Sequence, residues 1–538
     1  MSTDSNARAV PETVSVTAQG AVVSGMTLLS RISGFARDLL LSHFLGASAA
    51  ADAFLVAFRI PNFFRRLFAE GAFSQAFVPV LARYRALGPT ELKGFVAVIG
   101  GNLGLALMLV VILGVLFAEG LTLVFAPGFW REPAQLDLTA DLVRVTFPYL
   151  GFISLTAFAA AILNTHGRYA APAFTPVLLN LCLVLAMILA AQTGAGMAPA
   201  LAWGVLAAGV VQFAFLAPNV ARLGVAAAPR PSVRHEGARE VGRLLVPALL
   251  ASSAGQLNAL IDTILASMLL TGSIAWLYYA DRLLELPIGL VAVALGTVLL
   301  PSLSRLAGQE QRAAFSRTLD WGLRMGILLG LPASMALALL AEPLIATIFL
   351  HGEMTAIDAA MASLALRAFA CGALPLVLVK ILAPAFFADK DTRTPLRFAL
   401  IAIGVNVALN LSLFWWFGHV GGCLKGEAIL GRRAPVWLAL ATAASGWVHF
   451  WLLWRGVYAA GYYQATPALA RTGARALAAT LVMGGVLAAL SPSAEFWFAL
   501  SAWHRVPWLA GLVAAGGLTY AAALWVSGLR LAQLQHRV

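Results

Sequence analysis

The sequence reads SRISGFARDLLLSHFLGASAAADAFLVAFRIPNFFRRLFAEGAFSQAFVP from Ser30 to Pro79, and this stretch decides the fold. Its background composition is that of two membrane helices. A charge in hydrocarbon costs at least about 2.5 kcal/mol on insertion scales, so charged side chains there should face a watery cavity or one another. The charged residues of the stretch are Arg31, Arg37, Asp38, Asp52, Arg59, Arg65, Arg66 and Glu70.

The spacing of these charges places several of them on common helical faces. Asp52, Arg59 and Arg66 are seven residues apart and share one face of a helix. Arg31 and Asp38 share a face in the same way. A cationic cavity inside a membrane bundle needs an anionic occupant, so we expect an anionic ligand.

The composition of the whole chain is that of a polytopic, all-α membrane protein. Hydrophobic residues make up 61% of the 538 residues and charged residues 11%, and the mean hydropathy is +0.86. The net charge of +12 fits Lys and Arg in cytoplasmic loops, with an anionic lipid as ligand, better than nucleic acid. The three cysteines form no CxxC pair, so we expect neither a disulfide framework nor a metal site built on them.

About fourteen segments are long and apolar enough to span a membrane. They are roughly 16–45, 50–80, 94–124, 138–163, 172–192, 197–220, 241–270, 275–302, 317–350, 358–388, 395–418, 435–458, 470–491 and 506–529. Alternate loops carry the Lys and Arg residues, which favours a cytoplasmic position for those loops and for both termini. The first apolar segment is longer than the core of a signal peptide, so we expect it to remain as a helix.

The longest charged connector, 221–243, divides the chain into two pseudo-symmetric halves of six spans each. LNTHGRYAAPAFTP in the first half corresponds loosely to FFADKDTRTPLRF in the second, and such repeats are typical of transporters that rock one half against the other. The alternative is chance similarity of apolar composition. The predicted parts are a cytoplasmic tail 1–15, an N-lobe 16–220, a linker 221–240, a C-lobe 241–458, two C-terminal helices within 470–529 and a cytoplasmic tail 530–538.

The second half also places charged residues inside apolar segments. They are Asp281, Arg282 and Glu285 of YYADRLLELPIGL, and Lys380 of LVLVKILAPAFF. The alternative for each is an ion pair that only fixes helix packing. Cations outnumber acids among the intramembrane candidates, however, and the planar guanidinium of arginine suits a diphosphate.

Several long motifs resemble the MurJ (MviN) family of bacterial lipid II flippases, which belongs to the multidrug/oligosaccharidyl-lipid/polysaccharide exporter superfamily. The resemblance covers about residues 16–535. The motifs are SRISGFARD, ADAFLVAFRIPNFFRRLFAEGAFSQAFVPVL, TFPYL, AILNTHGRYAAPAFTPVLLN, WLYYADRLLELPIGLVAVALGTVLLPSLSR and DKDTRTP.

The resemblance implies fourteen helices, two lobes in a V and a central cationic cavity. It also implies transport of undecaprenyl-diphosphate-MurNAc-pentapeptide-GlcNAc from the cytoplasmic to the periplasmic leaflet of the inner membrane, for peptidoglycan synthesis. The family's cavity arginines match Arg31, Arg37, Arg65 and Arg282, and its cavity aspartate matches Asp52. Further substrate-binding candidates are Arg66, Asp281, Glu285 and Lys380. The two C-terminal helices would shape a groove for the lipid tail.

The chain departs from the family pattern after GHVG at 418–421. Sixteen residues, 422–437, separate GHVG from LALATA at 438–443, whereas in relatives the two motifs nearly adjoin. We expect this insertion to lie in a periplasmic connection. It explains why Lys425, Arg432 and Arg433 depart from the charge pattern of the other outer loops.

A second polar cluster is predicted deep in the second half. Asp262 interrupts NALIDTILASMLL, Asn406 and Asn410 are four residues apart in GVNVALNLSL, and Thr442 follows in LALATA. A carboxylate with amide and hydroxyl oxygens is a candidate sodium site, and resemblance to sodium-linked family members points the same way. The alternative is interhelical hydrogen bonding that only holds the helices together.

Three functions compete at this stage. A lipid-linked oligosaccharide flippase fits the arginines best, and the alternative within the superfamily is an exporter of lipid-linked polysaccharide or of drugs coupled to cations. A membrane glycosyl- or phosphotransferase would need paired carboxylates, and only Asp389 and Asp391 approach that pattern. No enzyme signature is found, so we expect no catalytic residues and no cofactor beyond a bound sodium ion. Expected partners are lipid II and membrane lipids, with the cell-wall synthesis machinery as a further candidate.

Overall fold

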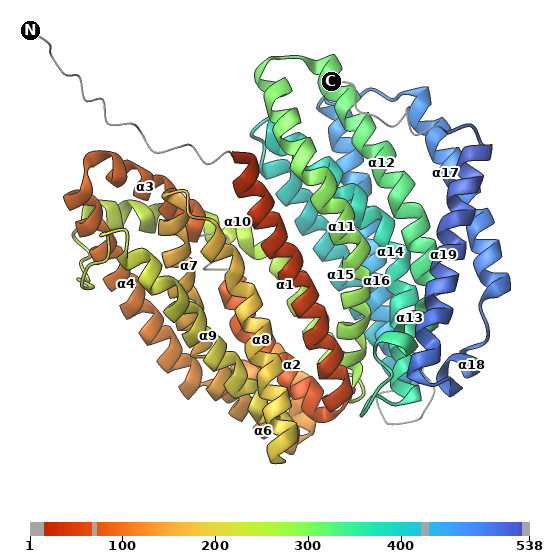
Figure 1. Cartoon of the computed structure of the whole chain (residues 1–538), viewed down its shortest axis with the longest axis horizontal. Coiled ribbons are helices and arrows are strands. Elements are labelled where there is room, and N and C mark those ends of the chain that lie inside the picture. The colour runs from red at the N-terminus through yellow and green to blue at the C-terminus, as the bar shows by residue number, and fades with distance from the viewer. Residues whose placement is uncertain (1–15, 67–72, 421–429, 530–538) are drawn as a thin grey trace, which may run out of the picture. The chain divides into compact units, whose positions relative to one another are not determined.

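The computed structural model describes residues 16–66, 73–420 and 430–529, and every regular element in this part of the chain is a helix (Figure 1). The all-α prediction is confirmed. The elements are α1 (Val16–Leu45), α2 (Ala49–Arg65), α3 (Phe73–Leu87), α4 (Pro89–Leu116), α5 (Ala118–Phe125), the 3-10 helix η2 (Pro127–Arg131), α6 (Pro133–Thr146), α7 (Tyr149–Thr165), α8 (Ala170–Thr193), α9 (Met197–Ala221), α10 (Glu236–Ser267), α11 (Ser273–Gly308), α12 (Arg312–Leu339), α13 (Ala341–Ile348), α14 (Ala356–Ala388), α15 (Arg393–Val420), α16 (Leu430–Ala459), α17 (Pro467–Leu490), α18 (Ala494–Ala499) and α19 (Ala502–Val526).

Within the described residues, 10 helices are long and apolar enough to cross a membrane. The chain is therefore a multi-pass membrane protein, as predicted. α1, α10 and α11 have 30, 32 and 36 residues, which exceeds the roughly 20 that a span requires, but they are not among these ten. The helix bounds alone do not establish the predicted number of fourteen.

Several segments predicted as single spans are broken into two helices. The segment 138–163 forms α6 and α7, which meet at Pro148, and 317–350 forms α12 and α13. The segment 50–80 contains α2 and α3, but residues 67–72 lie outside the described ranges, so it is not counted among these breaks. Hydropathy measures how apolar a segment is but not its backbone hydrogen bonds, so it does not reveal such breaks.

The chain folds into two compact units. Unit 1 comprises Met1–Asp38, Pro61–Leu116 and Arg144–Leu249, and unit 2 comprises Leu39–Ile60, Phe117–Val143 and Leu250–Val538. Four of the divisions fall inside helices, namely α1, α2, α6 and α10. These units therefore follow different boundaries from the predicted lobes 16–220 and 241–458.

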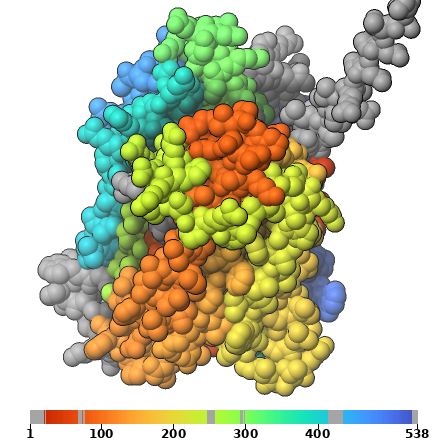
Figure 2. Space-filling model, turned by 90° about the vertical axis from the view of Figure 1, so that its left-hand side faces the viewer, coloured from red at the N-terminus to blue at the C-terminus, as the bar shows by residue number. Residues whose placement is uncertain are grey.

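The core of unit 1 is aromatic. Phe77 and Phe95 are fully buried, and the rings of Tyr84 and Phe95 stack with their centroids 4.3 Å apart. At Gly237, at the start of α10, a Cβ would lie 2.7 Å from the Tyr84 ring, so only glycine allows this approach. Arg83 pairs with Glu240, and Figure 2 shows the beginning of α10 lying against α3.

The linker of unit 1 runs from the end of α9 at Ala221 to the start of α10 at Glu236, within the predicted 221–240. It packs on α4. The backbone N–H of Arg230 donates to the carbonyl of Ala97 at 3.0 Å, and Asn102 bonds both backbone groups of Ser232, at 2.9 and 2.8 Å. The linker is thus held to α4 by specific hydrogen bonds.

The core of unit 2 is built on α14, which packs against α11, α12 and α16. At Gly372 on α14 a Cβ would lie 2.8 Å from the Cα of Ala443 on α16, so glycine permits close helix packing. The C-terminal helices α17 and α19 pack on α12 (Figure 1), where the Tyr520 hydroxyl donates to the Leu328 carbonyl at 2.7 Å.

A buried arginine joins the short helices of unit 2. Arg505, at the start of α19, is 6% exposed and donates to the carbonyls of Ala346, Leu350 and Trp497 at 2.9 Å each. These carbonyls lie near the C-terminal ends of α13 and α18, where a helix leaves its last acceptors unpaired. Sequence reasoning missed this role, because a lone arginine in an apolar segment carries no pattern.

The predicted insertion 422–437 is only partly described. Residues 422–429 lie outside the described ranges, whereas 430–437 form the first two turns of α16, which begins at Leu430. The second half of the insertion therefore lengthens a helix and is not a loop.

Candidate functional site

Arg37 and Asp38, both in the stretch 30–79, form an ion pair within unit 1. The guanidinium donates to Asp38 Oδ1 from Nε at 2.9 Å and from Nη2 at 2.6 Å. Nη1 donates to the side-chain oxygen of Asn180 on α8 at 3.1 Å. Arg31 and Asp38 lie seven residues apart in the single helix α1, and the ion pair of Asp38 is with Arg37.

The other arginines of unit 1 are more exposed. Arg31 on α1 and Arg66 after α2 are exposed, and Arg65 is half-buried and donates from Nε to Asn62 at 3.0 Å. Glu70, another charged residue of the stretch 30–79, lies outside the described residues. Unit 1 thus carries the predicted arginines Arg31, Arg37 and Arg65.

The remaining charged candidates belong to unit 2. Arg282 pairs with Glu285 at 2.9 Å and lies over the Tyr278 ring, 4.8 Å from its centroid. The half-buried Asp281 is close enough to Arg59 to interact with it electrostatically. Lys380 is exposed on α14.

Asp52, the predicted cavity aspartate, lies against the start of α11. Its carboxylate is 2% exposed, and its two oxygens accept backbone N–H bonds from Gly272 at 2.6 Å and from Ala275 at 2.9 Å. These are the first N–H groups of α11, which have no acceptor inside the helix. Asp52 therefore caps α11, and its charge also suits the positive end of the helix dipole.

Further close contacts in unit 2 hold the same region together. The Tyr279 hydroxyl donates to the Gly46 carbonyl at 2.8 Å, and the Glu353 N–H donates to the His43 carbonyl at 2.9 Å. A Cβ at Gly46 would lie 2.5 Å from the Glu353 carbonyl oxygen, and the positive φ of Gly46 also favours glycine. Nearby, Trp276 donates to Asp358 at 2.9 Å. We call segments 43–52, 272–279 and 352–358 the α11 junction.

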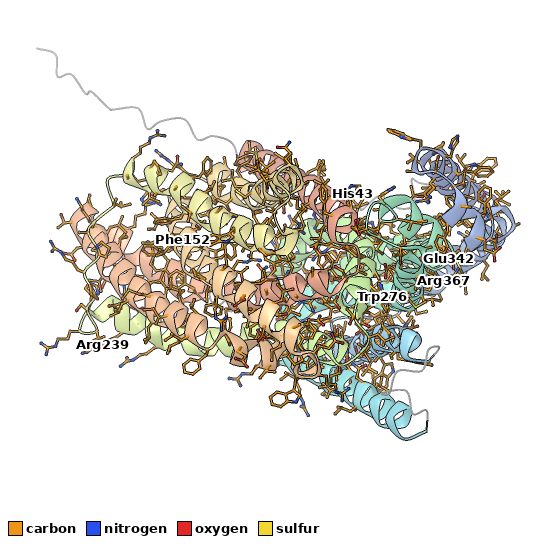
Figure 3. The ribbon with its side chains drawn as sticks, turned by 90° about the horizontal axis from the view of Figure 1, so that it is seen from below. His43, Phe152, Arg239, Trp276, Glu342 and Arg367 are labelled. Carbon is orange, nitrogen blue, oxygen red and sulfur yellow. The ribbon has the colours of Figure 1, made fainter. Side chains whose placement is uncertain are left out.

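Figure 3 shows where some of these side chains lie within their own units. Trp276 of the α11 junction is labelled there, as are Glu342 and Arg367, which lie close together. The latter two form an ion pair of 2.9 Å between α13 and α14. The ion pair between Glu342 and Arg367 is half-exposed, so it contributes little to stability.

In unit 1, Arg239 projects outward and is exposed.

The predicted ion cluster comes together in unit 2. Asn410 donates to the side-chain oxygen of Asn406, Asn406 donates to Thr442 at 3.2 Å, and Thr442 donates to Asp262 Oδ2 at 3.4 Å. Asn406 and Asn410 are fully buried. Asp262 Oδ1 and Asn410 Oδ1 are both buried without a hydrogen-bond donor. The cluster thus supplies carboxylate, amide and hydroxyl oxygens, which are the ligand type that a small monovalent cation takes.

Two neighbours of this cluster were not predicted as part of it. Asn258, one turn earlier on α10, donates to Asp262 Oδ2 at 3.4 Å. Arg59 on α2 donates to Thr263, the residue after Asp262, and it interacts electrostatically with Asp262. The sequence offered a signal for Asn258, which is four residues from Asp262, but none for the approach of α2. No group of three or more His, Cys, Asp or Glu side chains forms a metal site among the described residues.

The fold is shared with known transporters. An inward-facing multidrug resistance MATE family transporter of the MOP superfamily aligns with a TM-score of 0.61 at 16% identity, over 83% of this chain and 99% of that chain. A structure of lipid II flippase MurJ in an inward closed conformation aligns with a TM-score of 0.77 at 24% identity, over 94% and 98%. The chain thus has the all-helical, multi-pass membrane fold of these structures.

The family follows from the sequence comparisons. The model of the family described as lipid II flippase MurJ matches residues 41–506. A probable lipid II flippase MurJ of Vibrio cholerae is 40% identical over 524 residues, which cover 96% of this chain and 97% of the relative. The lipid II flippase MurJ of Burkholderia cenocepacia is 37% identical over 525 residues, covering 96% and 98%. This chain belongs to the MurJ family, which confirms the resemblance.

Proposed function

We propose that this protein carries lipid II, undecaprenyl-diphosphate-MurNAc-pentapeptide-GlcNAc, from the cytoplasmic to the periplasmic leaflet for peptidoglycan synthesis. The observation that carries the proposal is the family match over residues 41–506, with relatives of nearly equal length named as lipid II flippases. A transferase would need paired catalytic carboxylates, and the contacts of Asp389 and Asp391 do not support that role. Asp389 accepts a hydrogen bond from Tyr462, and Asp391 accepts from the first turn of α15.

In this proposal the arginines that bind the diphosphate are Arg31, Arg37, Arg65 and Arg282. Guanidinium groups bind phosphate oxygens through parallel N–H bonds, which gives both energy and orientation. The observed partners of Arg37 and Arg282 are the carboxylates of Asp38 and Glu285. A phosphate group would take over donors that now serve a carboxylate. Arg66, Asp281 and Lys380 tune the charge around the ligand.

Transport by alternating access needs contacts that exist in one conformation and not in the other. The bonds from Gly272 and Ala275 to Asp52 are suited to this role, since they join α2 to the first turn of α11 through one carboxylate. We assign to Asp52 the function of a latch that is closed in this structure. The same helix α11 carries Arg282, so opening the latch would free the helix that contributes to ligand binding.

A sodium ion held by Asp262, Asn406, Asn410 and Thr442 is the second part of the proposal. The two buried oxygens without donors, on Asp262 and Asn410, support it. A carboxylate in the bilayer is costly when it is uncompensated, so it must bind a proton or a cation. An ion that binds one conformation more tightly shifts the population by that differential affinity.

The membrane orientation completes the proposal. Positive charges in alternate loops favour a location in the bacterial inner membrane with both termini in the cytoplasm. C-terminal helices α17 and α19 border the lipid tail, and the cell-wall synthesis machinery uses the delivered lipid II.

Complementation tests the proposed function. A strain depleted of its own lipid II flippase should regain growth and normal shape when it expresses this chain. A chain that accumulates in the membrane of the depleted strain without restoring growth would contradict the proposal.

A further inference from the structure

A buried asparagine outside the predicted site contacts Arg37. Asn180 on α8 is 5% exposed, and its side-chain oxygen accepts the bond from Arg37 Nη1 at 3.1 Å. Its amide nitrogen donates to the Ser30 carbonyl at 3.1 Å and to the Ser33 hydroxyl at 3.0 Å. Both ends of the amide are thus used by α1, and this pattern fixes which atom is oxygen and which is nitrogen.

The helices approach closely at this point. A Cβ built at Gly34 would lie 3.4 Å from the amide nitrogen of Asn180, so the side chain of Asn180 rests on the backbone of α1. Ser30, Ser33, Gly34 and Arg37 share one face, since they are three or four residues apart. The motif SRISGFARD therefore includes a docking face for α8 as well as charged residues.

These bonds fix the plane of the guanidinium. Three N–H groups of Arg37 donate to two acceptors on different helices, Asp38 on α1 and Asn180 on α8. A guanidinium held only by its neighbour Asp38 could turn with the Arg37 side chain, because both residues lie on the same helix. The second acceptor, on a separate rigid helix, removes this freedom, and a side chain ordered in advance loses less entropy when it binds a ligand.

We propose that Asn180 is a positioning residue for ligand binding, which holds the guanidinium of Arg37 ready for a lipid-linked diphosphate. The neutral amide suits this purpose because it accepts a hydrogen bond without adding a second negative charge to that of Asp38, which already pairs with Arg37. A carboxylate at this place would compete with the phosphate for the same charge. This inference rests on the proposed function, in which Arg37 binds the diphosphate.

A double-mutant cycle on lipid II affinity tests the inference. Purified full-length protein in lipid nanodiscs is titrated with lipid II, using wild type, Asn180→Leu, Arg37→Ala and the double variant. We expect Asn180→Leu to weaken binding about fivefold to tenfold in wild type, in the range found for coupled neighbours. In the Arg37→Ala background the same substitution should change affinity less than twofold.

Asn102→Leu is the matched control. Asn102 also lies in unit 1 and its amide also bonds another segment at both ends, but to Ser232 of the linker. It should lower the melting temperature and leave lipid II affinity unchanged. If Asn180→Leu does not accumulate, Asn180→Asp takes its place, since it keeps an acceptor for Arg37 and adds a competing charge. We expect it to weaken lipid II binding as well.

Three results would overturn the inference. An equal loss of affinity from Asn180→Leu in both backgrounds would mean that Asn180 only packs α8 against α1. Unchanged affinity in Asn180→Leu, or in Asn180→Asp where that variant is used, would remove any role in binding. If Arg37→Ala itself binds lipid II like wild type, the assignment of Arg37 fails, and the inference fails with it. The affinity of the Arg37→Ala variant alone shows this outcome, so a failure of the proposed arginine site is distinguished from a failure of the role of Asn180.

Discussion

The carboxylate of Asp52 lies 2.6 Å from the backbone nitrogen of Gly272, and through this bond it caps α11. Gly272 has a φ of +93° and could not carry a side chain, because a Cβ would lie 2.7 Å from the Ala47 carbonyl oxygen. A glycine and an acid thus join α2 to α11 at a point where neither could be replaced freely. This relationship explains why an aspartate is buried among apolar residues.

Removing the cap should destabilise the closed junction. We expect Asp52→Ala to lower the free energy of unfolding by about 1–3 kcal/mol, because two helix N–H groups lose a charged acceptor. Asp52→Asn keeps one acceptor oxygen, so its free energy of unfolding should fall by about half as much. Thermal unfolding of the purified wild type and variants measures this order of stability.

The same variants test the latch. A single cysteine placed at Ala47, beside Gly272, should react faster with a soluble maleimide in Asp52→Ala than in a protein with Asp52. If the cysteine at position 47 reacts equally fast with and without Asp52, and if Asp52→Ala melts at the wild-type temperature, Asp52 acts neither as a latch nor as a stabilising cap.

Sodium should stabilise the protein through the Asp262 cluster. At a hundred times the dissociation constant, mass action gives about 2.7 kcal/mol of added stability, which potassium should not provide. Asp262→Ala should abolish the difference between the two salts while it leaves lipid II binding intact. The measurement is thermal unfolding in matched sodium and potassium buffers.

A matched variant separates an ion site from interhelical hydrogen bonding. Asn258→Ala removes one bond to Asp262 Oδ2 but leaves the oxygens of Asn406, Asn410 and Thr442 in place. It should keep the response to sodium with a modest loss of basal stability. Equal responses of wild type to sodium and potassium would mean that the cluster holds helices together or binds a proton.

Much of the fold could be predicted from the sequence, because the apolar segments are long and the membrane requires helices. The positions at which one predicted span breaks into two helices could not be predicted from the sequence. α6 and α7 are separated at Pro148, although other prolines such as Pro176 lie inside a helix without ending it. Whether a proline interrupts a helix depends on what packs around it, and that is decided by tertiary structure.

The candidate sites were predictable to different degrees. Asp262, Asn406, Asn410 and Thr442 were grouped correctly, since polar residues in apolar helices tend to find one another. The partner of Asp52 was not predictable, because the backbone N–H groups at the start of α11 leave no trace in residue identities. Asn180 was overlooked because a single asparagine in LLNLCLVL resembles ordinary interhelical hydrogen bonding.

Deletion of 422–429 should leave transport intact. The deletion stays outside α15 and α16 as the structure defines them, and changes in connection length cost little because closure entropy grows only logarithmically with length. Complementation of the depleted strain measures this. Deletion of all of 422–437 also removes the first two turns of α16, so we expect that variant to be less stable. A stable but inactive 422–429 deletion would reveal a role for the segment.

The turn before α15 should give a pH-dependent contribution to stability. Hydrogen bonding with the Thr394 side chain, and then with backbone N–H groups of Thr394 and Arg393, holds the pKa of Asp391 below its usual 3.8. A lowered folded-state pKa means that the stabilisation is complete above pH 3.8 and is lost as pH falls through the folded pKa. Asp391→Asn should therefore be less stable than wild type at pH 7. The difference in stability between wild type and Asp391→Asn should narrow only below about pH 3.8. A difference that already disappears by pH 6 would contradict a stabilising role of the ionised Asp391.

The arginines should contribute to lipid II affinity. Alanine at Arg31, Arg37, Arg65 or Arg282 should weaken lipid II binding by about 1.5–3 kcal/mol, roughly tenfold to hundredfold, because each loses a charged hydrogen bond to phosphate. Arg239→Ala is the control, since Arg239 is an exposed arginine of unit 1 outside the predicted set. Equal affinity of the control and of three of the four variants would exclude a diphosphate site on these residues.

The most direct test of the central claim is the exposure of lipid II at the outer leaflet of cells that depend on this protein. An enzyme that cleaves lipid II is added from the periplasmic side, and the fraction of labelled lipid II that it cleaves is measured. Cells with the wild-type chain should lose most of their lipid II, whereas cells with Arg37→Ala or Arg282→Ala at equal protein levels should retain it. Complete cleavage in cells carrying either variant, or protection in cells carrying wild type, would contradict the account.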